Sequence, residues 1–145
     1  MNKIDRIVLD TSVLVAAVSP NESSQNVALS FLRRVHESRQ CIEIPPTFLF
    51  EVYAALNRTP RKLSELLFLT EESGLNFLIH TQGTTEVQNM LEWLSVKAPG
   101  TVPTRGGDLA YLAIAVESGI PLFTFDKGMH AFSNYGVDIR YPDAF

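Results

Sequence analysis

Four acidic side chains stand where a strand or loop is expected to give way to a helix. They are Asp10, Glu51, Asp108 and Asp126. Because parallel strands of an α/β sheet end on one edge, such acids can meet in space although they are far apart in sequence. A cluster of like charges is unfavourable unless protons or a cation compensate it. Since no His or Cys set accompanies the acids, the pattern predicts a Mg²⁺ site, with Mn²⁺ as the alternative ion.

Each of these acids also has a purely structural interpretation. Three of them, Asp10, Asp108 and Asp126, stand where the side chain could cap the helix that follows. Glu51 could face solvent, but it shares a helical stripe with Phe48, and a glutamate turned inward is seldom buried without a partner. The placement of all four at one edge of one plausible sheet favours the metal site.

Two hydroxyl residues flank the acids along the chain. Ser12 lies two residues after Asp10, and Thr124 lies two residues before Asp126. Both are candidates for hydrogen bonds that orient the carboxylates. Ser12 could instead start a helix, and Thr124 could be an ordinary strand residue. The three histidines and Cys41 have no ligand spacing, so we expect the histidines at the surface or packed and the thiol as core filler.

Alternating strand and helix signals position these residues. Strands are expected at 7–9, 41–44, 76–80 and 122–125, with a fifth edge strand at 137–141. Helices are expected from Thr11 or Ser12 to Val18, from Ser23 or Ser24, from Thr47, around Leu63 to Leu67, from Thr84 or Thr85, around Asp108 up to Gly119, and from Lys127 or Gly128. The order predicts a three-layer α/β/α fold with a four- to five-stranded, mainly parallel sheet.

The apolar periodicity of these helices predicts which side chains face the core. The expected inward positions are Ala28, Phe31, Leu32 and Val35; Phe48, Val52, Ala55 and Leu56; Val87, Met90, Leu91 and Leu94; and Leu109, Leu112, Ala113 and Val116.

Composition limits the class of protein. The chain has 145 residues, of which 46% are hydrophobic and 19% charged, and these values fit one soluble domain over residues 1–145. A single cysteine excludes an internal disulfide, and no segment resembles a signal peptide or a membrane span. We therefore expect a cytoplasmic protein without a membrane partner. The net charge of −4 neither supports nor excludes nucleic-acid binding.

Three segments carry a family resemblance. They are Val8 to Ala16, Pro45 to Val52, and Gly107 to Ala115 followed by Gly119 to Asp126. In order and spacing the chain resembles PIN-domain proteins, specifically the VapC-type toxin ribonucleases. The resemblance implies a PIN-like fold and a metal-dependent endoribonuclease. It also implies an antitoxin partner that occupies a groove of the toxin, an RNA substrate, and a homodimer.

Phosphodiester hydrolysis assigns a role to each acid. We expect Asp10 and Asp108 to bind the metal ion directly, and Asp126 to bind it directly or through water. Glu51 would orient or deprotonate the attacking water, or hold a second ion. Attack by water instead of the ribose 2′-hydroxyl would leave 5′-phosphate and 3′-hydroxyl ends.

Other residues are candidates for binding the substrate or the antitoxin. The basic residues Arg58, Arg61, Lys62 and Arg105 could contact RNA phosphates or an acidic antitoxin tail, or they could form a solvated surface. The helix containing Leu63, Leu66, Leu67, Phe68 and Leu69 is apolar around much of its circumference. We predict that it forms the antitoxin groove with the helix before it; the alternative is complete burial within the monomer.

Other functions fit the sequence less well. A PIN-like module that binds RNA or protein without cutting remains the main alternative. A phosphoacceptor receiver domain would need paired acids after the first strand and an Asp after the third, where this chain has His80-Thr81-Gln82. A P-loop or dinucleotide-binding enzyme would need a glycine pattern that is absent.

Overall fold

The protein has an α/β fold built on a five-stranded, fully parallel sheet. The computed structural model describes residues 5–19, 23–55, 73–97 and 106–144. The strands are β1 (Arg6–Leu9), β2 (Cys41–Ile44), β3 (Asn76–Ile79), β4 (Leu122–Phe123) and β5 (Ile139–Arg140). The helices are α1 (Thr11–Val18), α2 (Gln25–Glu37), α3 (Phe48–Ala55), α5 (Thr84–Lys97), α6 (Gly106–Ser118) and α7 (Lys127–His130), with short 3₁₀ turns η3 (Ala131–Tyr135) and η4 (Pro142–Ala144). This architecture confirms the predicted fold class.

The strand order places a natural binding crevice next to β1. The order across the sheet is β3-β2-β1-β4-β5, so the chain builds outward from β1 in one direction and then returns to its other side. Val8 of β1 pairs with Glu43 of β2 on one side and with Leu122 of β4 on the other. In open parallel sheets, ligands bind beyond the carboxyl ends of the strands at such a reversal. That place lies at the ends of β1 and β4.

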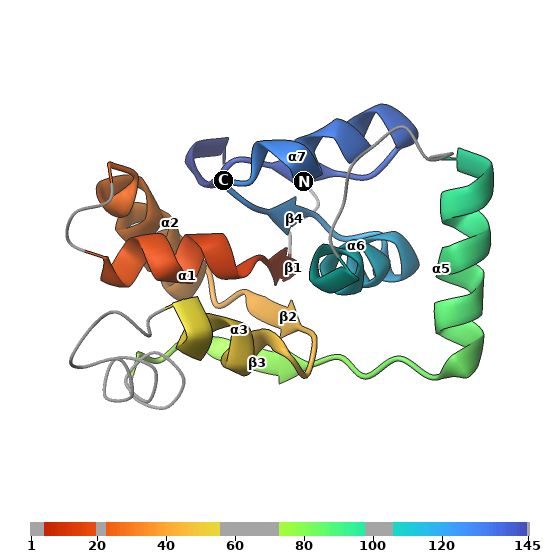
Figure 1. Ribbon diagram of the computed structural model, residues 1–145. Helices are drawn as coiled ribbons and strands as arrows, with labels where there is room; N and C mark the ends of the chain where they lie inside the picture. Colours follow the sequence, from red (N-terminus) through yellow and green to blue (C-terminus); the bar gives the residue numbers. More distant parts are fainter. Residues whose placement is uncertain (1–4, 20–22, 56–72, 98–105, 145) are drawn as a thin grey trace.

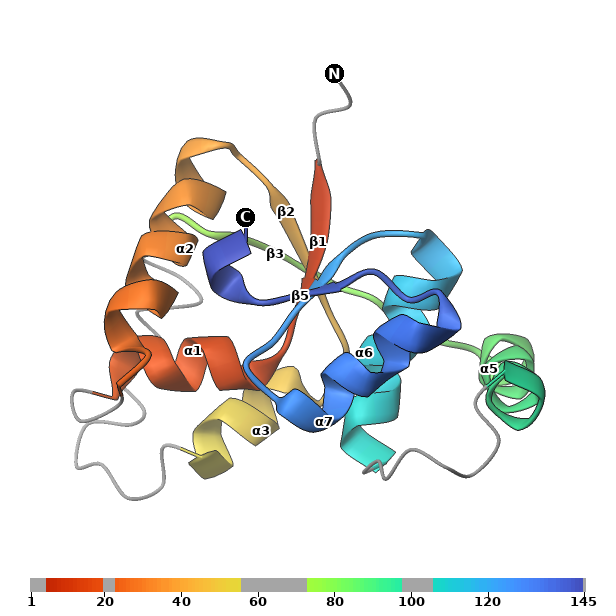
Figure 2. The ribbon, with the colours of Figure 1, turned by 90° about the horizontal axis from the view of Figure 1, so that it is seen from above.

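Helices cover both faces of the sheet. Figures 1 and 2 show α1 and α2 on one side of the central strands and α6 on the other. The predicted inward face of α2 is buried. The ring centroid of Phe31 in this helix lies 4.8 Å from the ring centroid of Phe123 in β4. Helix α6 ends before Gly119, whose φ of +63° suits glycine, as the sequence predicted. The sheet and α6 therefore share one apolar core.

Helix α5 is packed more loosely than its periodicity predicted. Only Met90 is buried in this helix, whereas Val87 and Leu91 are 45% and 57% exposed. A cavity of about 270 Å³ separates the apolar residues of α5 from Leu109 and Ala113 of α6. The prediction that Val87 and Leu91 face a core was wrong, because α5 stands at the edge of the fold (Figure 1) and its stripe borders this cavity.

Smaller differences concern ends of elements. Strand β4 stops at Phe123 instead of Phe125, and β3 at Ile79 instead of His80. Ala55 is exposed at the last turn of α3, where no described element covers it. Leu56 and the helix expected around Leu63 to Leu69 lie outside the described residues. No helix in the described ranges is long and apolar enough to cross a membrane.

Candidate active site

Asp10 lies at the reversal point of the sheet and is almost completely buried. It follows β1, is 5% exposed, and occupies the N-cap position of α1, but its side chain does not cap that helix. Instead, its Oδ2 accepts a hydrogen bond of 2.8 Å from the hydroxyl of Thr124, beyond the end of β4. The carboxylate is thus tied to the neighbouring strand, and the capping interpretation of Asp10 is wrong.

The hydroxyl groups around Asp10 form a network with defined donors. Thr124 has one hydroxyl proton, which goes to Asp10, so Thr124 Oγ1 acts as acceptor toward the backbone N–H of Asp126 at 3.0 Å. The contact of 3.3 Å to Ser12 Oγ must then be donated by Ser12. Ser12 Oγ itself accepts from the backbone N–H of Phe125 at 3.1 Å. Ser12 therefore reaches Asp10 only through Thr124, and it does not cap α1.

Glu51 reaches the same edge from the first turn of α3. Its Oε2 accepts a hydrogen bond of 2.5 Å from the hydroxyl of Tyr111, which is fully buried in α6. Burial raises the pKa of Glu51, and the charges of Asp10 and Asp108 raise it further, while the bonds from Tyr111 and Thr47 act in the opposite direction. The pKa of the Tyr111 hydroxyl is itself raised by burial and by Glu51. Glu51 is therefore not a solvated surface residue.

Asp108 approaches from the first turn of α6. The helix begins at Gly106, so Asp108 lies inside it and is not its N-cap. Gly107 lies close to the carboxylate of Glu51, because a Cβ atom at position 107 would be 2.8 Å from Glu51 Oε1 and would force that side chain to shift. Asp10, after β1, and Asp108, in α6, are thus both close enough to Glu51 for their charges to raise its pKa.

Asp126 performs a structural task at the same edge. Its Oδ1 accepts a hydrogen bond of 2.8 Å from the backbone N–H of Gly128 and caps α7. Its backbone N–H is held by Thr124. The side chain is exposed, so it is less enclosed than that of Asp10. Its role as a metal ligand stays a prediction.

The donor set fits a hard divalent ion in part. Within the described ranges, no three His, Cys, Asp or Glu side chains are arranged to hold a metal ion as they stand, so the predicted trio of ligands is not assembled. Mg²⁺, however, usually binds one or two carboxylates and keeps several waters. Burial is the main cause of the raised pKa of Glu51, and the charges of Asp10 and Asp108 add to it; a bound cation would compensate that repulsion. The four basic residues predicted to bind RNA lie outside the described residues.

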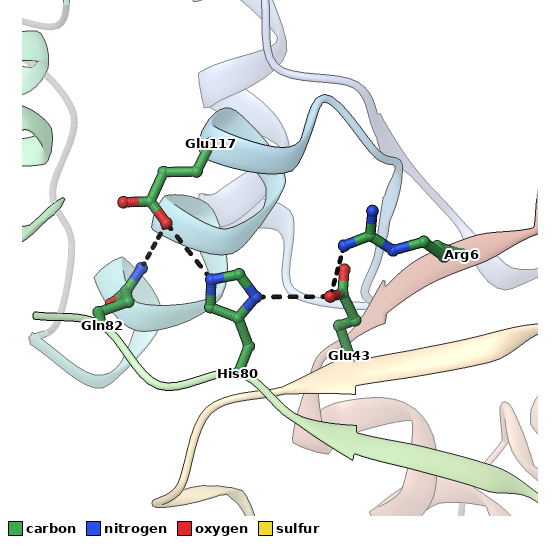
Figure 3. Close-up of polar contacts among 5 residues, drawn as sticks. All are labelled: Arg6, Glu43, His80, Gln82 and Glu117. Carbon is green, nitrogen blue, oxygen red and sulfur yellow. Dashed lines mark hydrogen bonds and ion pairs between the residues drawn. The ribbon is translucent and has the colours of Figure 1, made fainter.

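A second buried carboxylate lies elsewhere in the sheet. Glu43 of β2 is 1% exposed and accepts a hydrogen bond of 2.6 Å from Arg6 of β1. Figure 3 shows His80 between Glu43 and Glu117, with a nitrogen 3.4 Å from an oxygen of each. Gln82 also contacts Glu117. This group joins β1, β2 and the segment after β3 to the end of α6. The three histidines have no part in the acid cluster, as expected.

A family comparison identifies the fold. The model of the PIN domain matches residues 7–135 of the chain, a range that includes all four predicted acids. The chain belongs to the PIN-domain family. No curated protein matches the chain in sequence.

Several solved structures resemble the chain in fold. Mycobacterium tuberculosis VapC20, a sarcin-ricin-loop-cleaving toxin, is 20% identical, with 90% of this chain and 95% of that chain covered and a TM-score of 0.63. VapBC2 from Rickettsia felis, bound to a promoter DNA fragment, is 15% identical, with 94% and 98% covered and a TM-score of 0.69. FitAcB from Neisseria gonorrhoeae is 17% identical, with 94% and 97% covered and a TM-score of 0.67.

Sequence reasoning missed Tyr111 as a site residue. It stands three residues after Asp108, so both lie on one face of α6. A tyrosine in an otherwise apolar helix stripe was a usable signal, because a buried hydroxyl needs a partner. The partner, Glu51, is 60 positions away and could not be found from spacing.

Proposed function

We propose that this PIN-domain protein is a metal-dependent endoribonuclease that uses Mg²⁺ or Mn²⁺, and that it is the toxin of a type II toxin–antitoxin pair. The observation that supports the proposal is the raised pKa of Glu51, which burial causes and the charges of Asp10 and Asp108 increase, near the reversal point of the sheet. Perturbed carboxylates in such a place are typical of catalytic sites. The family membership supports a nuclease, and the names of the structural neighbours support an antitoxin partner.

The residues divide the work of hydrolysis. Asp10 and Asp108 would hold the ion, and Asp126 would join them directly or through a water. When bound, a divalent ion supplies a water of lowered pKa and compensates negative charge on the phosphate. Thr124 fixes the orientation of Asp10 through its hydrogen bond. Glu51 orients the attacking water or takes its proton, and its raised pKa makes it a stronger base than an exposed glutamate.

The proposal extends to partners and location. The substrate is RNA, cut to 5′-phosphate and 3′-hydroxyl ends, and the cognate antitoxin binds the toxin and blocks it. The active chain is a cytoplasmic homodimer built from one domain per protomer. The apolar stripe that α5 leaves exposed is compatible with a protein partner.

The decisive experiment measures cleavage of cellular RNA by the isolated protein. Cleavage should require Mg²⁺ or Mn²⁺, stop with EDTA, and leave ends that a 5′-phosphate-dependent exonuclease degrades. Asp108→Asn should remove activity while the circular dichroism spectrum stays unchanged. Expression should be toxic, and co-expression of the neighbouring gene should relieve the toxicity. Wild-type protein that is free of partner and binds RNA without cutting it would favour the non-catalytic binding module instead.

A further inference from the structure

Two aromatic rings are stacked beside the acid cluster. His130 ends α7, and Tyr141 follows β5; their ring centroids are 3.6 Å apart and the planes differ by 9°. Tyr141 is 39% exposed and His130 is half-buried, so the pair is partly open to solvent. The acid chemistry described above uses neither residue.

The sheet register sets this pair at the same edge as the acids. Strands β4 and β5 are parallel, and Phe123 pairs with Arg140. The backbone N–H of Thr124 donates a hydrogen bond of 3.1 Å to the carbonyl of Arg140. Tyr141 is thus level with Thr124, the residue whose hydroxyl holds Asp10. The aromatic pair stands at the carboxyl end of the strand next to β4.

Hydrogen bonds fix the ring of His130 and the backbone next to Tyr141. His130 Nε2 lies 2.9 Å from the carbonyl oxygen of Thr124, and because a carbonyl only accepts, Nε2 is the protonated nitrogen. On the other side of Tyr141, Arg34 of α2 donates a hydrogen bond of 3.0 Å to the carbonyl of Pro142. A ring that is fixed before the ligand arrives loses little conformational freedom on binding.

We propose that Tyr141, backed by His130, is a stacking platform for one nucleobase of the RNA substrate. Single-stranded RNA is commonly bound through bases stacked on aromatic side chains, and every base has a face that can stack. The exposed Lys127, at the start of α7, offers a cation to the backbone of the same strand. The platform rests on the proposed ribonuclease function, and it assigns a base-binding position at the end of β5, which β4 separates from β1 and Asp10.

Steady-state cleavage of a short single-stranded RNA tests the platform. Tyr141→Leu should raise KM about tenfold and leave kcat within about twofold, because a base remote from the reacting phosphate contributes equally to ground state and transition state. Tyr141→Phe keeps the ring and should restore the wild-type KM. Phe50→Leu is the matched control, since this ring is 77% exposed on α3 and no ring in the described residues stacks on it; the KM of this variant should stay unchanged.

A binding measurement makes the test independent of turnover. A 2-aminopurine RNA, titrated in EDTA, should lose fluorescence on binding wild-type protein and Tyr141→Phe, and bind Tyr141→Leu about tenfold more weakly. A fall in kcat with unchanged KM for Tyr141→Leu would show that the ring only supports Thr124, and would overturn the platform. An equal loss with Phe50→Leu would also overturn it. If wild type neither binds nor cuts RNA, the ribonuclease proposal fails and the platform fails with it; if wild type cuts and Tyr141→Leu matches it, only the platform fails.

Discussion

Two buried carboxylates of one sheet have opposite surroundings. Glu43 is bonded to the cation Arg6 and lies beside His80, so its charge is compensated by the protein (Figure 3). Asp10 is bonded to the neutral hydroxyl of Thr124, and the described part of the chain offers it no ion pair. It has other acids nearby instead, as the raised pKa of Glu51 shows. Within the described residues, the protein thus supplies a counter-ion to Glu43 and none to Asp10.

This difference separates a structural carboxylate from a functional one. A buried charge with its own counter-ion holds elements together, and removing it leaves the partner without compensation. Acids gathered without a described counter-ion destabilise the apo protein and gain when a cation arrives. Removal of the charge should therefore lower stability at Glu43 and lower activity at Asp10.

The largest effect is expected for Asp10→Asn. The amide keeps the acceptor for Thr124 but removes the charge, so RNA cleavage should fall more than about a hundredfold. Stability should stay equal or rise by up to about 1 kcal/mol, because repulsion with Glu51 is relieved. Initial cleavage rates and urea unfolding measure the two quantities. A loss of more than about 1 kcal/mol in unfolding free energy would make Asp10 a structural carboxylate like Glu43.

Thr124→Val should be the next most harmful change. The side chain is fully buried, and valine preserves its shape while three partners lose their hydrogen bond. We expect a loss of about 2 kcal/mol in unfolding free energy and about tenfold or more in kcat. Thr124→Ser keeps the hydroxyl and is the control for both measurements. Full activity of the valine variant would show that Asp10 does not need the hydrogen bond from Thr124 to orient its carboxylate.

Tyr111→Phe should slow cleavage about tenfold and move its pH dependence. The hydrogen bond from Tyr111 lowers the pKa of Glu51, so its loss raises that pKa. If Glu51 must be ionised to act, the acidic limb of the rate profile shifts to higher pH. Profiles of kcat against pH, at equal metal concentration, measure this. An acidic limb that moves to lower pH would show that the ionisation of Glu51 does not control the cleavage rate.

Glu43→Gln should affect stability and spare catalysis. Because Arg6 is about half exposed, with a side chain 47% accessible, the loss should be about 1 kcal/mol, below the value for a fully buried pair. Cleavage rates should remain within about twofold of wild type. Thermal unfolding and the RNA assay decide the outcome. A large loss of activity would make the network of Figure 3 part of the catalytic apparatus.

The smallest effect is expected for Asp138→Asn. This residue pairs with Arg140 at 2.8 Å, but both side chains are substantially exposed, at 48% and 34%. Solvent screening limits such a pair to about 0.5 kcal/mol or less. Urea unfolding beside Glu43→Gln gives the matched comparison. Equal losses of unfolding free energy in the two variants would mean that burial does not determine how much an ion pair stabilises this protein.

The sequence was sufficient for most of the fold. Short, largely apolar runs predicted all five strands, and the stripe of Ala28, Phe31, Leu32 and Val35 predicted the buried face of α2. The prediction of buried residues from periodicity failed in α5. An apolar stripe indicates which side chains a helix could bury, but it does not indicate whether a neighbouring element covers them. Thr124 was expected to bond one of the carboxylates, and the structure pairs it with Asp10.

The finer geometry of the site depends on distant pairs. Tyr111 meets Glu51 across 60 positions, and His130 meets Tyr141 through the packing of α7 on β5. Capping could not be assigned either: the sequence allowed Asp10 and Asp126 equally as caps, and only Asp126 uses its side chain in that way. The spacing of residues along the chain does not indicate which of two equivalent aspartate side chains accepts a hydrogen bond from a backbone N–H group.

The cavity beside α5 has a consequence for motion. A helix with one buried side chain among 14 residues gains little from remaining docked, so α5 should open on its own while α6 and the central strands stay closed. Amide protons of α5 should then exchange with deuterium well before those of α6. A partner that filled the hollow would slow this exchange, and the retardation would report its binding without any assay of cleavage.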